Sequence, residues 1–262
     1  MSSPVITLLS DFGVQDGYAA SMKGVILRIC PQAKLVDISH LIPPQVVRSG
    51  AYVLYASYEY FPHGTVHLAV VDPGVGTERG ALAIRTSHFF FVGPDNGLFS
   101  LILKKEADWE ARRLENRQFR LSPLSSTFHG RDLFAPAAAH LALGIPFESL
   151  GPICSPISPE WDEPVIEKDK VEGELIHIDR FGNAITNVLH ETLAIRGPAE
   201  EWTITAGKST INSIHQTYGR VKVGEALALT GSTGFIEIAV NQGSAALELG
   251  LEVGMRVTFR KV

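Results

Sequence analysis

Residues 66–99 read VHLAVVDPGVGTERGALAIRTSHFFFVGPDNGLF, and this stretch decides the fold. It opens with an apolar run at residues 66–71 that predicts a buried strand and stops at Asp72. A Pro-Gly-Val-Gly turn follows, and it ends the strand because proline lacks an N–H and glycine admits positive φ. The turn closes at Arg79, before a second apolar run at residues 81–84.

This arrangement places a carboxylate at the carboxyl end of a buried strand, beside a glycine-rich loop with an arginine on its far side. In open α/β sheets, ligands bind at that edge. The alternative is that Asp72 only caps its own turn. These residues alone do not separate the two interpretations.

The first part of the chain predicts strands that alternate with helices. Strands are expected at residues 5–9, 35–38, 66–71, 81–84, 89–92 and 109–114, and helices at residues 18–30, 46–58 and 132–143. The order β-α-β-α-β indicates an α/β fold, with a mostly parallel sheet that carries helices on both faces.

The sequence changes character after the last of these helices. Residues 151–169 hold four prolines and several charges, which is typical of an exposed linker. Short strands are then expected at residues 173–178, 203–206, 226–230, 235–240 and 256–260, with one brief helix at 245–249. The prediction is an N-terminal α/β domain (1–155), a linker (156–170) and a C-terminal all-β domain, a small barrel or sandwich (171–262).

Composition narrows the class of protein. Of 262 residues, 45% are hydrophobic and 19% are charged, which suffices for a large core. The net charge of −5 and the absence of a basic cluster argue against nucleic acid as a partner. No apolar run reaches membrane-spanning length, the N-terminus lacks signal-peptide features, and the two cysteines lack metal-type spacing. We expect a soluble, cytoplasmic protein that binds neither nucleic acid nor membranes.

Polar residues gather at four predicted loops. These are the segment 10–16 with Asp11 and Asp16, the Asp72–Arg79 turn, the segment 128–132 with His129, and the segment 179–183 with Asp179. Each has a plain alternative: Asp11 and Asp16 capping the first helix, His129 lying on the surface, and Asp179 forming an ion pair with Arg180 that adds no measurable stability.

No metal-ligand spacing, nucleophile elbow or phosphate-binding loop accompanies these clusters. The residues alone therefore predict a small-molecule site lined by carboxylates, and no metal.

Six motifs, in the order SDFG, DPGVGTERG, GPDNG, FHGRDLFAPAAA, IDRFGNAITN and GSTGFIEIAVNQGSA, resemble the S-adenosylmethionine hydroxide adenosyltransferases. These enzymes are relatives of the S-adenosylmethionine-dependent fluorinase and chlorinase. The resemblance implies an N-terminal α/β domain, a C-terminal β-barrel, and a homotrimer whose active sites lie between subunits. S-adenosylmethionine is then the substrate, and no cofactor is implied.

In the hydrolytic members of this family, an Asp, an Arg and a His hold and activate water, and the matching positions here are Asp72, Arg79 and His129. The fluorinase replaces the aspartate by tyrosine, and its halide-contacting serine is Gly130 here. The resemblance therefore implies hydrolysis to adenosine and L-methionine, by attack of water on the ribose C5′. A sensor with little turnover and a halide adenosyltransferase remain the alternatives.

The family's substrate contacts carry over residue by residue. Asp11 matches the ribose-binding carboxylate, Asp16 and Asp179 match acidic positions near the methionine ammonium, and Ser232 matches a serine that contacts methionine. Phe181 and Asn183 match residues that flank and read adenine, with Tyr218 stacking on it. Phe128, Gly130 and Val240 complete the expected contacts. Glu237 is added independently of the resemblance, as a carboxylate in the same strand pair. Two positions depart from the halogenases: Thr233 replaces an arginine that pairs with the methionine carboxylate, and Gln45 replaces an aromatic wall.

Overall fold

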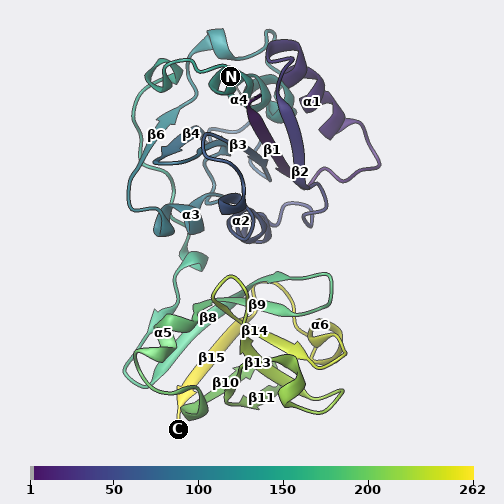
Figure 1. Ribbon diagram of the computed structural model, residues 1–262, viewed down its shortest axis with the longest axis vertical. Coiled ribbons are helices and arrows are strands. Elements are labelled where there is room, and N and C mark those ends of the chain that lie inside the picture. The colour runs from purple at the N-terminus through teal and green to yellow at the C-terminus, as the bar shows by residue number, and fades with distance from the viewer. Residues whose placement is uncertain (1–2) are drawn as a thin grey trace. The chain divides into compact units, whose positions relative to one another are not determined.

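The computed structural model describes residues 3–262 (Figure 1). They divide into two compact units, the described chain up to Pro159 and Glu160–Val262. The boundary falls inside the expected linker, whose last part contributes a short strand, β7 (Val165–Ile166), to the second unit.

The first unit is built on a six-stranded sheet with the order β2-β1-β3-β5-β4-β6. Its strands are β1 (Val5–Ser10), β2 (Lys34–Ser39), β3 (Val66–Val70), β4 (Ala81–Thr86), β5 (Phe90–Pro94) and β6 (Trp109–Arg113). β2, β1, β3 and β5 pair in parallel, whereas β4 pairs antiparallel with both β5 and β6. The mostly parallel sheet expected from the sequence is confirmed.

Helices cover both faces of this sheet (Figure 1). The helices are α1 (Tyr18–Ile29), α2 (Val47–Tyr55), α3 (Ser100–Lys105) and α4 (Ala135–Ala142). α1 and α4 pack on one face, where Met22, Ile26 and the alanines of α4 meet Ile6 and Leu8 of β1. Small alanine side chains let α4 approach the sheet closely. Within residues 3–262, no helix is long and apolar enough to cross a bilayer.

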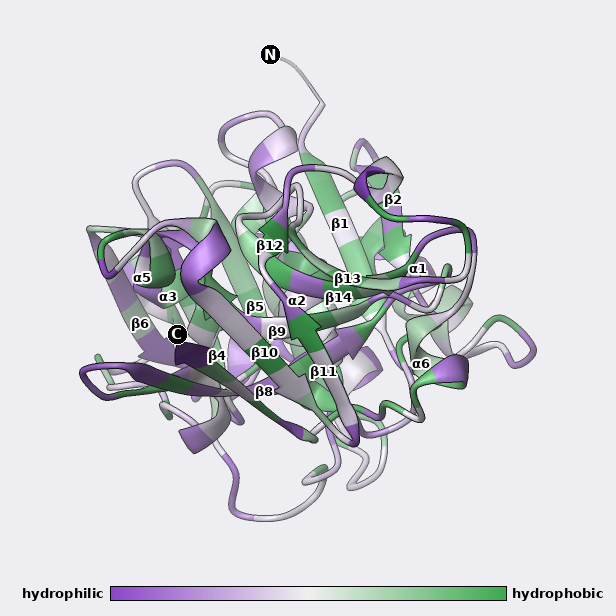
Figure 2. Ribbon diagram, turned by 90° about the horizontal axis from the view of Figure 1, so that it is seen from below, coloured by the Kyte–Doolittle hydropathy of each residue, from purple (hydrophilic) through white to green (hydrophobic). Residues whose placement is uncertain are grey.

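The position of each strand follows from its side chains. All five residues of β3 are buried, as expected for a central strand covered on both faces. β2, at the edge, mixes polar and apolar residues and is mostly accessible. In Figure 2, β1 is mainly green, for hydrophobic residues, while β2 next to it mixes green and purple.

The second unit is a nearly closed barrel, which confirms the expected all-β fold. Its strands follow the order β11-β10-β15-β8-β9-β14-β13-β12, with β7 paired to β8. They are β8 (Lys170–Ile178), β9 (Ala184–Leu189), β10 (Trp202–Ala206), β11 (Ser209–Asn212), β12 (Ile214–His215), β13 (Ala226–Thr230), β14 (Phe235–Val240) and β15 (Arg256–Lys261), with helices α5 (His190–Ala194) and α6 (Ala245–Glu248). Trp202 and Phe259 lie fully buried in its core.

Some elements differ from the sequence-based expectation. The helix expected at residues 46–58 ends at Tyr55, and a separate 3-10 turn carries the buried Tyr58, whose hydroxyl donates to Glu106. The helix expected at residues 132–143 begins earlier, with one wide π turn at Gly130–Phe134. The strands β7, β9, β11 and β12 and the short helices α3 and α5 were not expected.

Candidate active site

Two carboxylates meet at one edge of the parallel sheet. β1 and β3 are paired so that Ser10 lies opposite Val70, and each strand ends one or two residues before an aspartate, Asp11 and Asp72. Burial raises the pKa of Asp11, and the nearby negative charge of Asp72 raises it further. The expected ligand-binding edge is therefore formed by residues that are close in space and far apart in sequence.

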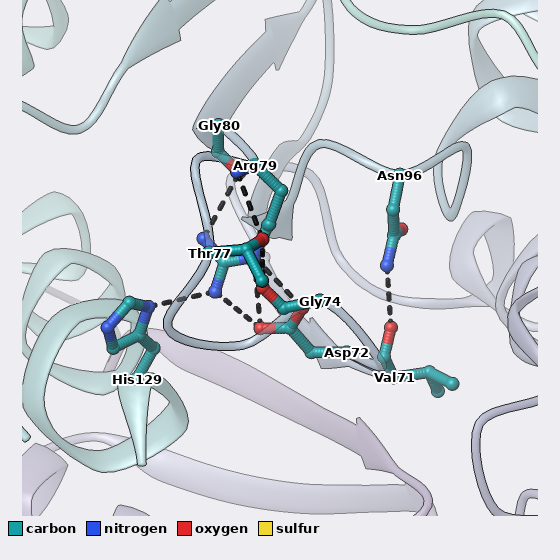
Figure 3. A network of polar contacts seen from close by, with 8 residues as sticks. All are labelled: Val71, Asp72, Gly74, Thr77, Arg79, Gly80, Asn96 and His129. Carbon is teal, nitrogen blue, oxygen red and sulfur yellow. Dashed lines mark hydrogen bonds and ion pairs between the residues drawn. The ribbon is translucent and has the colours of Figure 1, made fainter. Parts of the chain in front are cut away.

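Asp72 and Arg79 form a nearly buried ion pair across the 72–80 loop (Figure 3). Arg79 Nε donates to both carboxylate oxygens, at 2.9 and 3.1 Å, and Arg79 Nη2 donates to Oδ2. The side chains are only 5% (Asp72) and 10% (Arg79) exposed. The Arg79 guanidinium also lies over the ring of Phe134, 5.1 Å from its centroid. Asp72 thus bonds across the loop and does more than cap its own turn.

His129 joins this pair through its Nδ1 atom. Arg79 Nη2 lies 2.9 Å from His129 Nδ1, and because a guanidinium only donates, Nδ1 must carry the lone pair. Burial, and then the positive charge of Arg79, lower the pKa of His129, so the ring is neutral near pH 7. The ring proton is therefore on Nε2, which is left as a hydrogen-bond donor.

The 72–80 loop approaches the segment before His129 very closely. Gly76 has φ of 77°, and a Cβ at this position would lie 2.3 Å from the carbonyl oxygen of Ser126. Any larger residue would push the two segments apart. Gly76 therefore permits the close packing of the 72–80 loop against the segment that precedes His129.

The Asp11 side chain is held by the backbone of another loop. Its Oδ2 accepts a hydrogen bond of 2.8 Å from the N–H of Gln45, which has φ of 67°. Gly17, and neither Asp11 nor Asp16, occupies the N-cap position of α1, so the capping alternative fails for both aspartates. Asp16 is exposed.

Aromatic side chains adjoin this edge of the sheet. Phe128 makes edge-to-face contacts with Phe12 and Tyr18, with ring centroids 5.9 and 5.3 Å apart. Gly130 is buried, and a Cβ there would lie 3.0 Å from the sulfur of Met22 and 3.3 Å from Phe12. The expected contacts Phe128 and Gly130 thus lie in one packed layer beside His129.

A hydrogen-bonded network next to Asp11 was not predicted from the sequence. Ser10 Oγ lies 2.7 Å from His40 Nδ1, and His40 Nε2 lies 3.1 Å from Asp37, which also binds Lys23 at 2.6 Å. The His40 carbonyl accepts from Gly13 N at 2.7 Å, so the two loops are joined twice. The SDFG motif contained Ser10, but no spacing rule connects it to a histidine thirty residues away.

The second unit assembles four of its expected residues. Asp179 accepts hydrogen bonds of 2.9 Å from the backbone N–H groups of Phe181 and Asn183 and from Asn183 Nδ2. Asn183 Nδ2 also lies 3.4 Å from the Tyr218 hydroxyl, which is 3.3 Å from Glu237 Oε2. Glu237 is 7% exposed, and burial, followed by the charge of Asp179, raises its pKa.

The remaining predicted residues of this unit lie in different environments. Phe181 is 75% exposed, and Ser232 is exposed as well. Thr233 Oγ1 is buried and has no hydrogen-bond partner among the described residues. The Val240 side chain lies in the barrel core, so any contact it makes with a ligand has to come from its backbone. The binding roles of all these residues stay predictions.

In the part of the chain that the structure describes, no three His, Cys, Asp or Glu side chains are placed to hold a metal ion. Cys30 and Cys154 are free thiols.

Two family models match the sequence. The N-terminal domain of SAM hydroxide adenosyltransferases covers residues 6–151, and the C-terminal domain covers residues 173–258. The chain belongs to this family. The matched ranges include the Asp72–Arg79–His129 cluster of the first unit and the Asp179–Glu237 cluster of the second.

Curated relatives agree over nearly the whole chain. The (R)-S-adenosyl-L-methionine hydrolase of Thermus thermophilus is 43% identical, with 96% of this chain and 98% of that protein covered. The hydrolase of the same name from Salinispora tropica is 39% identical, with 97% of each covered. A fluorinase from Nocardia brasiliensis is more distant, at 26% identity over 98% of this chain and 97% of that protein.

Solved structures share the fold. An uncharacterized conserved protein from Thermotoga maritima superposes with a TM-score of 0.87 at 37% identity, covering 98% of this chain and all of that one. A conserved hypothetical protein from Thermus thermophilus gives a TM-score of 0.79 at 40% identity, covering 99% of this chain and all of that one.

Proposed function

We propose that this protein hydrolyses S-adenosyl-L-methionine to adenosine and L-methionine. The observation that carries the proposal is the Asp72–Arg79–His129 cluster, in which one arginine holds a carboxylate and a neutral imidazole together. The names of relatives at 38–43% identity support the same reaction.

The proposed step is an in-line displacement at the ribose C5′. The oxygen of water forms a bond to C5′, the bond from C5′ to sulfur breaks, and methionine leaves as a neutral thioether with the electron pair. Asp72 takes the proton of the attacking water. His129 donates through Nε2 and orients the water oxygen, because its Nδ1 is already bonded to Arg79.

The chemistry needs only a weak base. Two donor groups of Arg79, Nε and Nη2, bond to the Asp72 carboxylate and hold it in place. A sulfonium is a strong leaving group that requires no protonation. Attack on a cation also neutralises charge in the transition state. We propose that the enzyme uses no metal or cofactor, so its activity should survive dialysis against a chelator.

We further propose a cytoplasmic homotrimer with active sites between subunits. The family resemblance supports the assembly, and the exposed aromatic ring of Phe181, beside the Asp179 turn, suits a contact that is completed by another molecule. The two free thiols suit a reducing compartment. Light scattering coupled to size-exclusion chromatography tests the trimer.

The test of the reaction is incubation in ¹⁸O-labelled water with the two sulfonium epimers of the substrate supplied separately. The relatives are named for the (R) form, so we propose that this epimer is turned over faster. Adenosine labelled at the 5′ oxygen, with free methionine, supports attack of water at C5′. Substrate recovered bound and unchanged favours the sensor, and a requirement for chloride or fluoride favours the halide transferase.

A further inference from the structure

The motif GPDNG, residues 93–97, lies outside the Asp72–Arg79–His129 cluster but reaches both ends of the 72–80 loop. Its first two residues end β5, the strand that pairs with β3 on one side and β4 on the other, and the other three form the turn after it. The 72–80 loop runs from just beyond β3 to just before β4. The turn after β5 is therefore positioned to bond with the start and the end of this loop.

Asn96 holds the start of the loop (Figure 3). Its Nδ2 donates a 2.8 Å hydrogen bond to the carbonyl of Val71, the fully buried residue immediately before Asp72. Its Oδ1 accepts from Leu98 N at 3.3 Å, which fixes the orientation of the amide. Without this donor, a buried carbonyl next to Asp72 would lose its side-chain partner.

Asp95 holds the end of the loop. Its backbone N–H donates to the carbonyl of Gly80 at 2.9 Å, and its carboxylate, 2% exposed, lies 3.3 Å from Arg113 Nη1. The Arg113 guanidinium covers Gly80 so closely that a Cβ there would lie 1.3 Å from Nη1. Gly80 is therefore held by the Asp95 N–H on one side and by the Arg113 guanidinium on the other.

The pinned carbonyl also contacts Arg79. Arg79 Nη1 donates to the oxygen of Gly80 at 3.2 Å, so the same oxygen accepts from Asp95 and from Arg79. Fixing this carbonyl fixes one edge of the guanidinium whose other edge holds Asp72 and His129. The motif thus acts on both members of the ion pair, on Asp72 through Val71 and on Arg79 through Gly80.

We propose that Asn96 and Asp95 are positioning residues that set the Asp72–Arg79 pair for attack of the nucleophile. This inference rests on the proposed hydrolysis. Displacement reactions demand near-attack distances of about 3–3.5 Å, and a shift of about 1 Å can cost about a hundredfold in rate. A clamp on both ends of a glycine-rich loop meets that demand without touching the substrate.

The test compares Asn96→Ala and Asn96→Asp with the same changes at Asn116. Asn116 is a matched control, since its Nδ2 donates to the Ser149 carbonyl at 2.8 Å and its Oδ1 accepts from Gln118 N at 3.0 Å. We expect both changes at Asn96 to lower kcat about ten- to a hundredfold with KM within about twofold. The Asn116 variants should lose thermal stability to a similar degree and keep kcat.

A second measurement separates this proposal from the proposed reaction. In protein labelled with ¹⁵N-arginine, the Arg79 Nε–H that donates to Asp72 should give a distinct resonance, assigned through Arg79→Lys. We expect Asn96→Asp to shift it and Asn116→Asp to leave it in place. If the wild-type protein shows no hydrolase activity, the proposed reaction is refuted, and the resonance still tests the positioning role of Asn96. The positioning role is refuted if Asn96→Asp leaves the resonance in place, or if kcat falls equally in the Asn96 and Asn116 variants.

Discussion

Replacing Asp72 by asparagine removes the proposed proton acceptor and preserves the shape of the side chain. The amide keeps one oxygen that can accept from Arg79, but its NH₂ faces another of the arginine's donors. The guanidinium, with its side chain only 10% exposed, then retains the neutral His129 and loses its counter-charge. The substitution therefore tests both proton transfer and the charge balance of the site.

The expected loss can be derived from these two roles. A positioned general base contributes about 10²- to 10⁴-fold, which is roughly 3–5 kcal/mol of barrier at 1.36 kcal/mol per tenfold. Removing one partner of a buried ion pair costs up to about 3–5 kcal/mol of stability. Since domains have about 5–15 kcal/mol of stability, the variant should remain folded, with a lower melting temperature.

The assay measures adenosine release by chromatography, at a temperature where the variant is folded. We expect kcat to fall at least a hundredfold while KM changes little, because Asp72 contacts the nucleophile and does not hold the substrate. Glu110→Gln, which removes a carboxylate from an arginine pair on β6, is the control and should retain kcat. If Asp72→Asn keeps kcat within about threefold of wild type, Asp72 is not the proton acceptor.

Three further changes have defined outcomes. Burial and then Asp72 raise the pKa of Asp11, so the folded protein holds this proton at a pH where the unfolded chain has lost it. Stability therefore falls as pH rises through that window, and Asp11→Asn should abolish the fall in urea titrations while raising KM. Burial lowers the pKa of His67 to about 3. Below about pH 6.5, the free energy of unfolding should fall by up to about 1.4 kcal/mol for each pH unit of acidification. His67→Phe should remove this slope in the same titrations. Gly76→Ala should lower kcat at least about tenfold, whereas Gly64→Ala, with φ of 84° and free space at its Cβ, should cost stability alone.

The sequence predicted strands well where an apolar run stops at polar residues that are closely followed by glycine or proline, as at β1 and β3. It failed for β9, because two of its buried residues are polar. Thr186 bonds to the carbonyl of Ile236, and Asn187 Nδ2 bonds to that of Trp161. Polar side chains that find backbone partners inside a barrel break the apolar pattern on which strand prediction depends.

The residues of the site that act through their side chains could be predicted from the sequence. Asp72 and Arg79 lie in one loop, so their pairing could be expected from local sequence. His129 stood out as a polar loop residue, but its grouping with this pair came from the family resemblance. The Gln45 N–H that holds Asp11 could not be expected, because backbone donors have no sequence signature. The tautomer of His129 was also beyond prediction, since it depends on which ring nitrogen Arg79 meets.

The charges at this edge of the sheet suit a cationic substrate. Burial, and to a smaller extent the charge of Asp72, raises the pKa of Asp11, while Arg79 offsets one negative charge and His129 is neutral. The positive charge of a bound sulfonium would favour the ionised form of Asp11. After the reaction, both products leave without the sulfonium charge, so this attraction ends. The charge of the substrate thus offsets the cost of burying the Asp11 carboxylate, and the products do not, which favours binding of the substrate over retention of its products.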